Sequence, residues 1–162
     1  MARIVMHRDS KQDFSKDMLL QLVTFHIENA EYGVDILHVQ EIIRMIDITH
    51  MPNTLEHIDG VINLRGNVIA VMDLRRRFGL VPRTHDSQTR IMVVNLAGTV
   101  MGFVVDAVSE VLRIPAGTVA PPPPVMETVD AQYVIGVGKL EDRLLILIDL
   151  EKIAGEPENM AA

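Results

Sequence analysis

The sequence predicts an all-β (mainly β) protein with a few short helices, in which two related halves each close into a small β-barrel. Three observations lead to this prediction. Most apolar residues fall in runs of about four to eight that are rich in Val, Ile and Leu and bounded by Gly, Asn or Asp, which is typical of strands. The same order of strands, turns and helix caps occurs twice along the chain. A sheet of roughly four or five short strands must close on itself to cover its edges.

The elements of the first half are predicted from these apolar runs and the turn residues between them. Its strands are expected at residues 22–27, 61–64 and 68–72. Its hairpin turns are expected at residues 29–31 and 65–67. A short helix is predicted over residues 73–79, because Asp73 supplies an N-cap acceptor and Gly79 follows the last turn. A single helical turn is expected near residues 35–40.

The second half repeats this order. Its predicted strands cover residues 91–96, 100–105, 110–114, 133–140 and 144–148, and its predicted hairpin turns lie at residues 97–99 and 141–143. A second short helix is predicted over residues 149–155, again between an Asp and a Gly. Prolines 121–124 must lie in a loop or a polyproline II stretch.

An internal repeat relates the two halves. At an offset of 69 the matching pairs are Gly33 and Gly102, Val39 and Val108, Glu41 and Glu110, and Arg44 and Arg113. At an offset of 76 they are Gly60 and Gly136, Leu64 and Leu140, and Asp73 and Asp149. The repeat predicts two barrels that pack side by side about a pseudo-twofold axis and leave a groove between them.

The domain boundaries follow from composition. We expect a flexible N-terminal arm (1–18), a folded domain (19–155) with approximate halves 20–79 and 90–155 joined by a polar linker (80–89), and a loose C-terminal tail (156–162).

The composition excludes several classes of protein. The 15 Lys and Arg against 22 Asp and Glu give a formal charge of −7, whereas nucleic-acid binders usually carry a basic excess. The absence of Cys excludes disulfides, thiol nucleophiles and thiolate metal sites. No apolar run approaches the ~20 residues of a membrane helix, and the N-terminus is too charged for a secretory signal. We expect a cytoplasmic protein, with no direct membrane insertion.

No pattern of an active site is present. The six histidines do not form a His-Glu-x-x-His motif, and the sequence has no nucleophile elbow, phosphate loop or dinucleotide fingerprint. The segment Gly136-Val137-Gly138 lacks a third glycine and is predicted to pack closely in a strand. Four carboxylates lie next to turns and are interpreted as capping groups: Asp35, Asp73, Asp106 and Asp149. We expect that the protein is not an enzyme and that it binds no metal ion and no cofactor.

Charged residues in unusual places are candidates for partner recognition. Arg65 lies at a tight turn, where its forked donor suits a carboxylate or backbone carbonyls of a partner, although turn stabilisation is an alternative. Its counterpart in the repeat is Glu141. Glu41 is either a plain outward-facing residue or a polar anchor in an apolar binding strip. The basic cluster at residues 75–77 is interpreted as a solvated helix face, or as a patch for an acidic protein.

Four ordered blocks resemble the CheW family of chemotaxis coupling proteins. They are residues 31–42 (EYGVDILHVQEI), 60–75 (GVINLRGNVIAVMDLR), 102–112 (GFVVDAVSEVL) and 142–149 (DRLLILID), within a match over about residues 19–155. The resemblance implies two SH3-like five-stranded β-barrel subdomains. It also implies a non-enzymatic adaptor that joins the cytoplasmic tip of a methyl-accepting chemoreceptor to the regulatory domain of the histidine kinase CheA. Such an adaptor is cytoplasmic and peripherally associated with inner-membrane receptor arrays. The longer CheV and CheA proteins are not expected as whole-chain matches.

The resemblance also implies residue roles. Val39, Glu41 and Arg65 match positions linked to receptor or kinase contact, and Gly60, Gly102 and Val111 match positions whose change impairs coupling. With Ile42 and Asn63 they form the predicted binding set, in which Val39, Ile42 and Val111 supply apolar anchors for a receptor helix. Where family members can place an arginine and an aromatic for a second ring contact, this chain has Ala120 and Val125.

Three other functions stay open at the level of sequence. The same module could serve a receptor–kinase pathway other than chemotaxis, such as surface motility, and genome neighbourhood would separate these two. A small β-barrel enzyme would require an acid–base pair or metal site. A nucleic-acid-binding double barrel would require the arginines at 75–77, against the acidic balance and the 4% aromatic content.

Overall fold

The computed structural model describes residues 18–51, 58–122 and 131–155. The predicted arm (apart from Met18), the predicted tail, His57, prolines 123–124 and Val125 lie outside the described residues.

The first copy of the repeat contains five strands and one α-helix. In chain order these are β1 (Leu19–Ile27), β2 (Ala30–Asp35), the 3-10 helix η1 (Ile36–His38), β3 (Val39–Arg44), β4 (Ile58–Leu64), β5 (Asn67–Asp73) and α1 (Leu74–Arg77). All three strands predicted here are confirmed. The prediction omitted β2, which carries Glu31 and Gly33 in an otherwise strand-like run, and left β3 as an unassigned extended stretch.

The second copy has the same order with one short additional strand. Its elements are β6 (Arg90–Leu96), β7 (Thr99–Val105), β8 (Ala107–Pro115), η2 (Ala116–Thr118), β9 (Val119–Ala120), η3 (Ala131–Tyr133), β10 (Val134–Lys139), β11 (Leu144–Ile148) and α2 (Leu150–Ala154). The five strands predicted here are confirmed.

The predicted caps are present, as are the hairpin turns predicted at residues 65–67, 97–99 and 141–143, whereas the turn predicted at residues 29–31 lies instead at Glu28-Asn29, between β1 and β2. Asp73 Oδ1 accepts from the backbone N–H of Arg75 at 2.9 Å, and Asp149 Oδ1 accepts from that of Glu151 at 3.0 Å. The turns at Arg65-Gly66 and Ala97-Gly98 have positive φ at both central residues, 50° and 91° in the first and 52° and 93° in the second. This geometry suits the twist of the two strands that each turn joins.

The strands pair differently from the sequence prediction. Among the described residues they form two sheets, with strand orders β8-β1-β2-β11-β10-β9 (barrel 1) and β3-β6-β7-β5-β4 (barrel 2). Each sheet therefore combines the first two strands of one copy with the later strands of the other. The prediction that each contiguous half forms its own barrel is wrong, because the chain crosses from one sheet to the other between β2 and β3 and again between β7 and β8.

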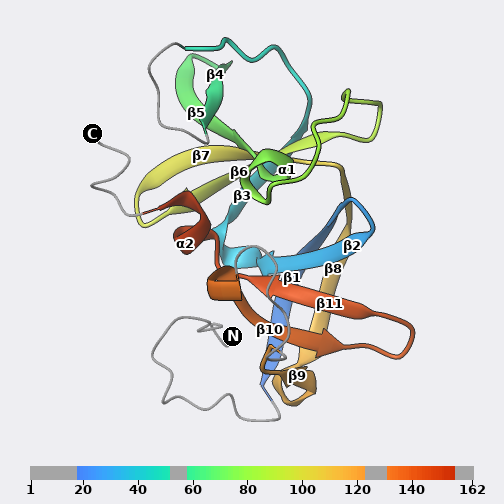
Figure 1. Ribbon diagram of the computed structural model, residues 1–162. Coiled ribbons are helices and arrows are strands. Elements are labelled where there is room, and N and C mark those ends of the chain that lie inside the picture. Colours follow the sequence, from blue (N-terminus) through green and yellow to red (C-terminus); the bar gives the residue numbers. More distant parts are fainter. Residues whose placement is uncertain (1–17, 52–57, 123–130, 156–162) are drawn as a thin grey trace.

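The exchange preserves the predicted pseudo-symmetry. Replacing every strand in the order of barrel 2 by its counterpart in the other copy reproduces the first five strands of barrel 1. The parallel pairs correspond in the same way, because β5 pairs with β7 in barrel 2 and β11 pairs with β2 in barrel 1. The two barrels are thus equivalent units of a pseudo-twofold arrangement, placed one above the other in Figure 1.

Both sheets close on themselves. In barrel 1 the edge strand β8 leads through the three-residue η2 into β9, which pairs with β10 at the other edge. In barrel 2 the chain after β3 reaches β4, where Thr49 and Val61 exchange backbone hydrogen bonds of 2.8 and 2.9 Å. This closure covers sheet edges that would otherwise be free to pair with another chain.

Three apolar clusters hold the fold together. One lies inside barrel 1 and includes Leu20, Leu22, Leu145 and Leu147. Another lies inside barrel 2 and includes Ile62, Val71, Ile91 and Val93. The largest joins the outer faces of the two sheets to α1 and α2, and includes Phe25, Met92, Phe103, Leu74 and Ile153. Along β6, alternate residues therefore face the inside of barrel 2 and the inter-barrel core.

Candidate partner-binding surface

An exposed ion pair closes one end of barrel 2. The guanidinium of Arg65, at the β4–β5 turn, contacts Glu41 on β3. Strands β3 and β4 are the two edges of the sheet order, so this pair links the two edges. Asn63 Oδ1 accepts from the N–H of Gly66 at 2.9 Å and thereby supports the turn that carries Arg65. The structure thus brings together three residues of the predicted set.

Arg65 keeps most of its side chain in solvent. Its side chain is 67% exposed, against 29% for Glu41, and Glu41 is its only ion-pair partner among the described residues. An exposed pair of this kind contributes at most about 1 kcal/mol to stability. A carboxylate of another molecule can therefore compete for Arg65 at little cost to the fold.

Barrel 1 has an equivalent ion pair that the sequence analysis missed. Glu110 on β8 is the counterpart of Glu41, and Arg143 Nη2 lies 2.7 Å from its Oε2. The repeat pointed to Glu141 as the counterpart of Arg65, but the arginine that closes barrel 1 stands two residues later. A search for an arginine near the equivalent turn, allowing a shift of two positions in the repeat, would have identified Arg143.

The two ion pairs differ in how tightly they hold the arginine. Arg143 is 33% exposed and also contacts Glu31, with 2.6 Å between Nε and Oε1. Its hydrogen bond to Glu31 raises the pKa of Arg143, against the opposing effect of desolvation. Glu31 is only 7% exposed, and its Oε2 has no hydrogen-bond partner among the described residues. Arg143 compensates a buried carboxylate of the fold, whereas Arg65 pairs only with the more exposed Glu41 among the described residues.

Two of the predicted site residues lie inside barrel 2. A Cβ at Gly60 would lie 2.2 Å from the carbonyl oxygen of Thr49, and a Cβ at Gly102 would lie 2.8 Å from Ile91 Cγ2. The counterpart of Gly60 is also confined, since a Cβ at Gly136 would lie 2.7 Å from Val119 Cγ1. The close packing predicted around Gly136 is confirmed. Gly60 and Gly102 are packing positions with no surface for a partner.

The three predicted apolar anchors border the inter-barrel core. Val39 packs against this core from the start of β3. Ile42 lies opposite Met92, and its counterpart Val111 lies opposite Val23 on the other sheet. Directly opposed residues share a face, and both Met92 and Val23 belong to the inter-barrel core. Ile42 and Val111 are exposed and continue that apolar face to the margin of the core on each barrel.

Only Arg76 of the basic cluster is exposed, so the three arginines do not form one solvated face or interaction patch. Arg75 is buried, Arg76 Nη1 lies 2.5 Å from Asp59 Oδ1, and Arg77 donates from Nε to the carbonyl of Ile153 at 3.1 Å. Arg77 also lies over the ring of Tyr133, with Cζ 4.8 Å from the centroid. All three arginines are engaged within the chain, which removes the residues that a nucleic-acid-binding function would require.

The described residues contain no group of three or more His, Asp and Glu placed to hold a metal ion. A hollow of about 360 Å³ lies beside the segment after β3 and is lined by Met45, Ile48, His50, Asp59 and His85, among others. His50 Nδ1 lies 2.9 Å from the backbone oxygen of Asp59. No helix in the described part of the chain is long and apolar enough to cross a membrane.

Ala120, one of the two residues at the position of the second ring contact that the family resemblance implies, lies in the short strand β9.

Two strand-exchanged barrels with an exposed ion pair and apolar margins define a protein-binding module of the scaffold type. The CheW-like domain family model matches residues 21–158, and the chain therefore belongs to the CheW family. It is 40% identical over 138 residues to "Chemotaxis protein CheW" of Klebsiella aerogenes, a match that covers 85% of this chain and 83% of that protein. It is 35% identical over 144 residues to the protein of the same name from Helicobacter pylori, covering 89% and 86%.

A solved structure agrees with this assignment. The crystal structure of the scaffolding protein TtCheW from Thermoanaerobacter tengcongensis is similar to this fold with a TM-score of 0.78 and 39% sequence identity. The match covers 86% of this chain and 94% of that one. The chain is thus a chemotaxis scaffold or adaptor protein of the CheW family.

Proposed function

We propose that this chain is a non-catalytic adaptor that couples the cytoplasmic tip of a methyl-accepting chemoreceptor to the regulatory domain of the histidine kinase CheA. Family membership and the scaffold name of the structural relative support the proposal. The observation that carries it is that β3 contributes both to the exposed Arg65–Glu41 pair at the end of barrel 2 and, through Ile42, to the exposed apolar margin on its outer face. A strand that offers both a charge and an apolar anchor suits a protein partner better than a small substrate.

The binding step follows from these properties. A receptor tip is a helical hairpin, and a helix of this kind docks through apolar side chains at regular spacing. Val39 and Ile42 would receive such side chains along β3. The free donors of Arg65 would then take a carboxylate of the partner, at the cost of an exposed ion pair that contributes little to stability. Val39 and Ile42 would supply the contact area, and Arg65 would set the register.

The second partner would bind a different face. The pseudo-symmetry places Val111 on barrel 1 at the position equivalent to Ile42 on barrel 2. An adaptor that holds receptor and kinase on separate faces couples them without chemistry, and repetition in an array raises the effective concentration of each contact. We infer a cytoplasmic location at the inner membrane, where the receptors would hold the chain peripherally.

The test is a reconstitution with receptor-bearing membranes, CheA and ATP. The wild-type chain should sediment with the membranes and raise kinase phosphorylation. The variant Arg65→Glu should lower the affinity for one partner by at least about tenfold, because the partner's carboxylate would face a like charge. Lys152→Glu is the matched control, since it makes the same charge change at an exposed site on α2, outside both strands proposed to dock partners. Unchanged binding of both partners by Arg65→Glu would remove this residue from the mechanism.

A further inference from the structure

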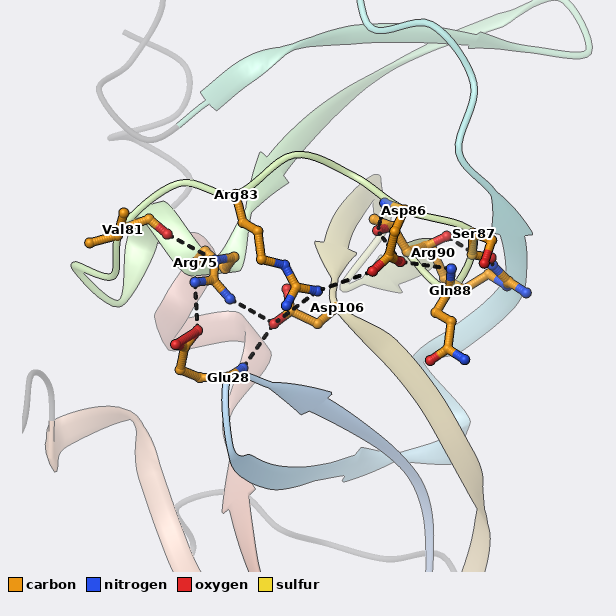
Figure 2. Close-up of polar contacts among 10 residues, drawn as sticks. Glu28, Arg75, Val81, Arg83, Asp86, Ser87, Gln88, Arg90 and Asp106 are labelled. Carbon is orange, nitrogen blue, oxygen red and sulfur yellow. Dashed lines mark hydrogen bonds and ion pairs between the residues drawn. The ribbon is translucent and has the colours of Figure 1, made fainter.

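Arg75 differs from every other arginine described above in the number of structural units that it joins. It lies in α1, directly after β5 of barrel 2, and its side chain is only 8% exposed. Figure 2 shows it surrounded by three acceptors. Nη2 lies 2.5 Å from Glu28 Oε1, Nη1 lies 2.7 Å from Asp106 Oδ2, and Nε donates to the carbonyl of Val81 at 3.0 Å.

These acceptors belong to separate parts of the fold. Glu28 is in the β1–β2 turn of barrel 1, Asp106 is the single residue between β7 and β8, and Val81 belongs to the segment between the two copies. Asp106 Oδ2 also accepts from the N–H of Glu28 at 2.8 Å, and its own N–H donates to the carbonyl of His26 at 3.1 Å. One continuous polar network therefore runs from barrel 2 through Arg75 into barrel 1.

Most of the remaining contact between the barrels is the apolar inter-barrel core, and the contacts of Arg77 with Ile153 and Tyr133 add a second polar link. Burial of apolar surface keeps the two outer faces together, but it has no preferred direction and specifies the angle between the barrels weakly. Hydrogen bonds from a planar, forked guanidinium to fixed acceptors are directional. Arg75 supplies this directional component at the edge of the inter-barrel core.

The pseudo-symmetry shows that this arrangement is one-sided. At the offset of 76 the counterpart of Arg75 is Glu151, which cannot make the same contacts. Arg77 and its counterpart Ile153 contact each other directly, so the pseudo-twofold axis passes between α1 and α2. Helix α1 thus carries two arginines that reach from barrel 2 to elements packed on barrel 1.

We infer that Arg75 is a positioning residue that fixes the relative orientation of the two barrels, and thereby the spacing between their docking faces. The functional part of this inference rests on the proposed adaptor function, because only an adaptor needs a set distance between two partners. The structural part stands without it. Neither Arg75 nor its acceptors needs to touch a partner.

The test measures the distance between the barrels directly. The chain contains no cysteine, so spin labels can be placed specifically at V68C on β5 and L144C on β11, two exposed positions on different barrels. Electron–electron distance measurement on the otherwise unchanged chain should give one narrow distribution. Adding Arg75→Gln should broaden it at least about twofold at a temperature well below unfolding, as expected for loss of a directional lock on a rigid-body contact.

The matched control is Arg76→Gln on the same helix. Arg76 pairs with Asp59 of β4, within barrel 2, so its loss should leave the distance distribution unchanged. If Arg75→Gln does not fold, Glu28→Gln removes one contact from a half-exposed partner and should give a smaller broadening. A residue that merely stabilises the fold would lower the melting temperature without widening the distribution. If Arg75→Gln folds, or Glu28→Gln in its place, and the distance distribution between the two labels keeps its wild-type width, the inference is overturned.

The reconstitution separates this inference from the proposed function. If the inference is correct, Arg75→Gln should bind receptor membranes and kinase separately within about twofold of wild type, yet stimulate the kinase at least about fivefold less, because the loss is one of geometry. Equal stimulation would overturn the functional part. A wild-type chain that binds neither partner would overturn the adaptor function and this functional part together, while the distance measurement still decides the role of Arg75.

Discussion

Gly60 shows how a single residue without a side chain can matter for an adaptor without touching a partner. Its missing Cβ leaves room for the carbonyl of Thr49, which lies 2.2 Å from the position where a Cβ would stand. That carbonyl accepts the hydrogen bond of 2.9 Å from Val61 that helps to close barrel 2. The resemblance to the family implies that change at this position impairs coupling, and the structure gives a packing reason for such an effect.

We predict that Gly60→Ala lowers the free energy of unfolding by about 3 kcal/mol or more, because a backbone oxygen cannot yield as a side chain can. Gly98→Ala is the matched control. Gly98 has a φ of 93° and no atom within 4 Å of an added Cβ, so it should lose only about 1–2 kcal/mol from backbone strain. Urea unfolding of the two variants measures the difference. Equal losses would show that barrel 2 tolerates the added methyl group.

At the scale of the elements, the arginines at the ends of the two barrels have different tasks. Arg143 compensates the carboxylate of Glu31, which is 7% exposed, and also binds Glu110. Its loss would leave a buried charge without a partner, which destabilises a fold more than loss of an exposed pair. Among the residues that the structure describes, Arg65 has one half-buried partner, and most of its side chain is in water.

We therefore predict that Arg143→Met lowers the melting temperature clearly, whereas Arg65→Met changes it little, since an exposed pair contributes about 0–1 kcal/mol. Calorimetry on the two variants measures this. The double variant Glu31→Gln/Arg143→Met should recover part of the loss, because the buried charge is removed with its partner. The same melting temperature for both single variants would contradict the difference assigned to the two barrels.

The elements also show how far the sequence could lead. Hairpin turns and caps were predictable, since Gly66, Asp73 and Asp149 act through neighbours within a few residues. Strand β2 was missed because Glu31 and Gly33 weaken its local pattern, and both are explained only by the other copy: Glu31 binds Arg143, and Gly33 faces Leu145 and Leu147. The candidate site was likewise predictable only in part. Glu41 and Arg65 were predictable as unusual charges, but their mutual contact depends on barrel closure.

At the scale of the whole molecule, the exchange of strands between the barrels could not be predicted from the repeat. In a pseudo-twofold arrangement, β1 and β2 meet equivalent partners whether the following strands come from the same copy or the other one. The apolar pattern and the offsets of 69 and 76 are the same in both cases. Only the paths of the chain from β2 to β3 and from β7 to β8 decide between them, and each is too short to carry a clear signal.

The exchange leads to a prediction that distinguishes the two arrangements. Fragments 1–84 and 85–162, divided in the exposed segment between the copies, should each lack the dispersed amide spectrum of a folded protein. Each sheet needs strands from both fragments, so neither fragment can close a barrel or bury its apolar strands alone. An equimolar mixture should recover the spectrum of the intact chain with a dissociation constant of about 1 μM or below, because association forms three core clusters at once. Two fragments that fold separately would instead place one barrel in each half and contradict the strand order found here.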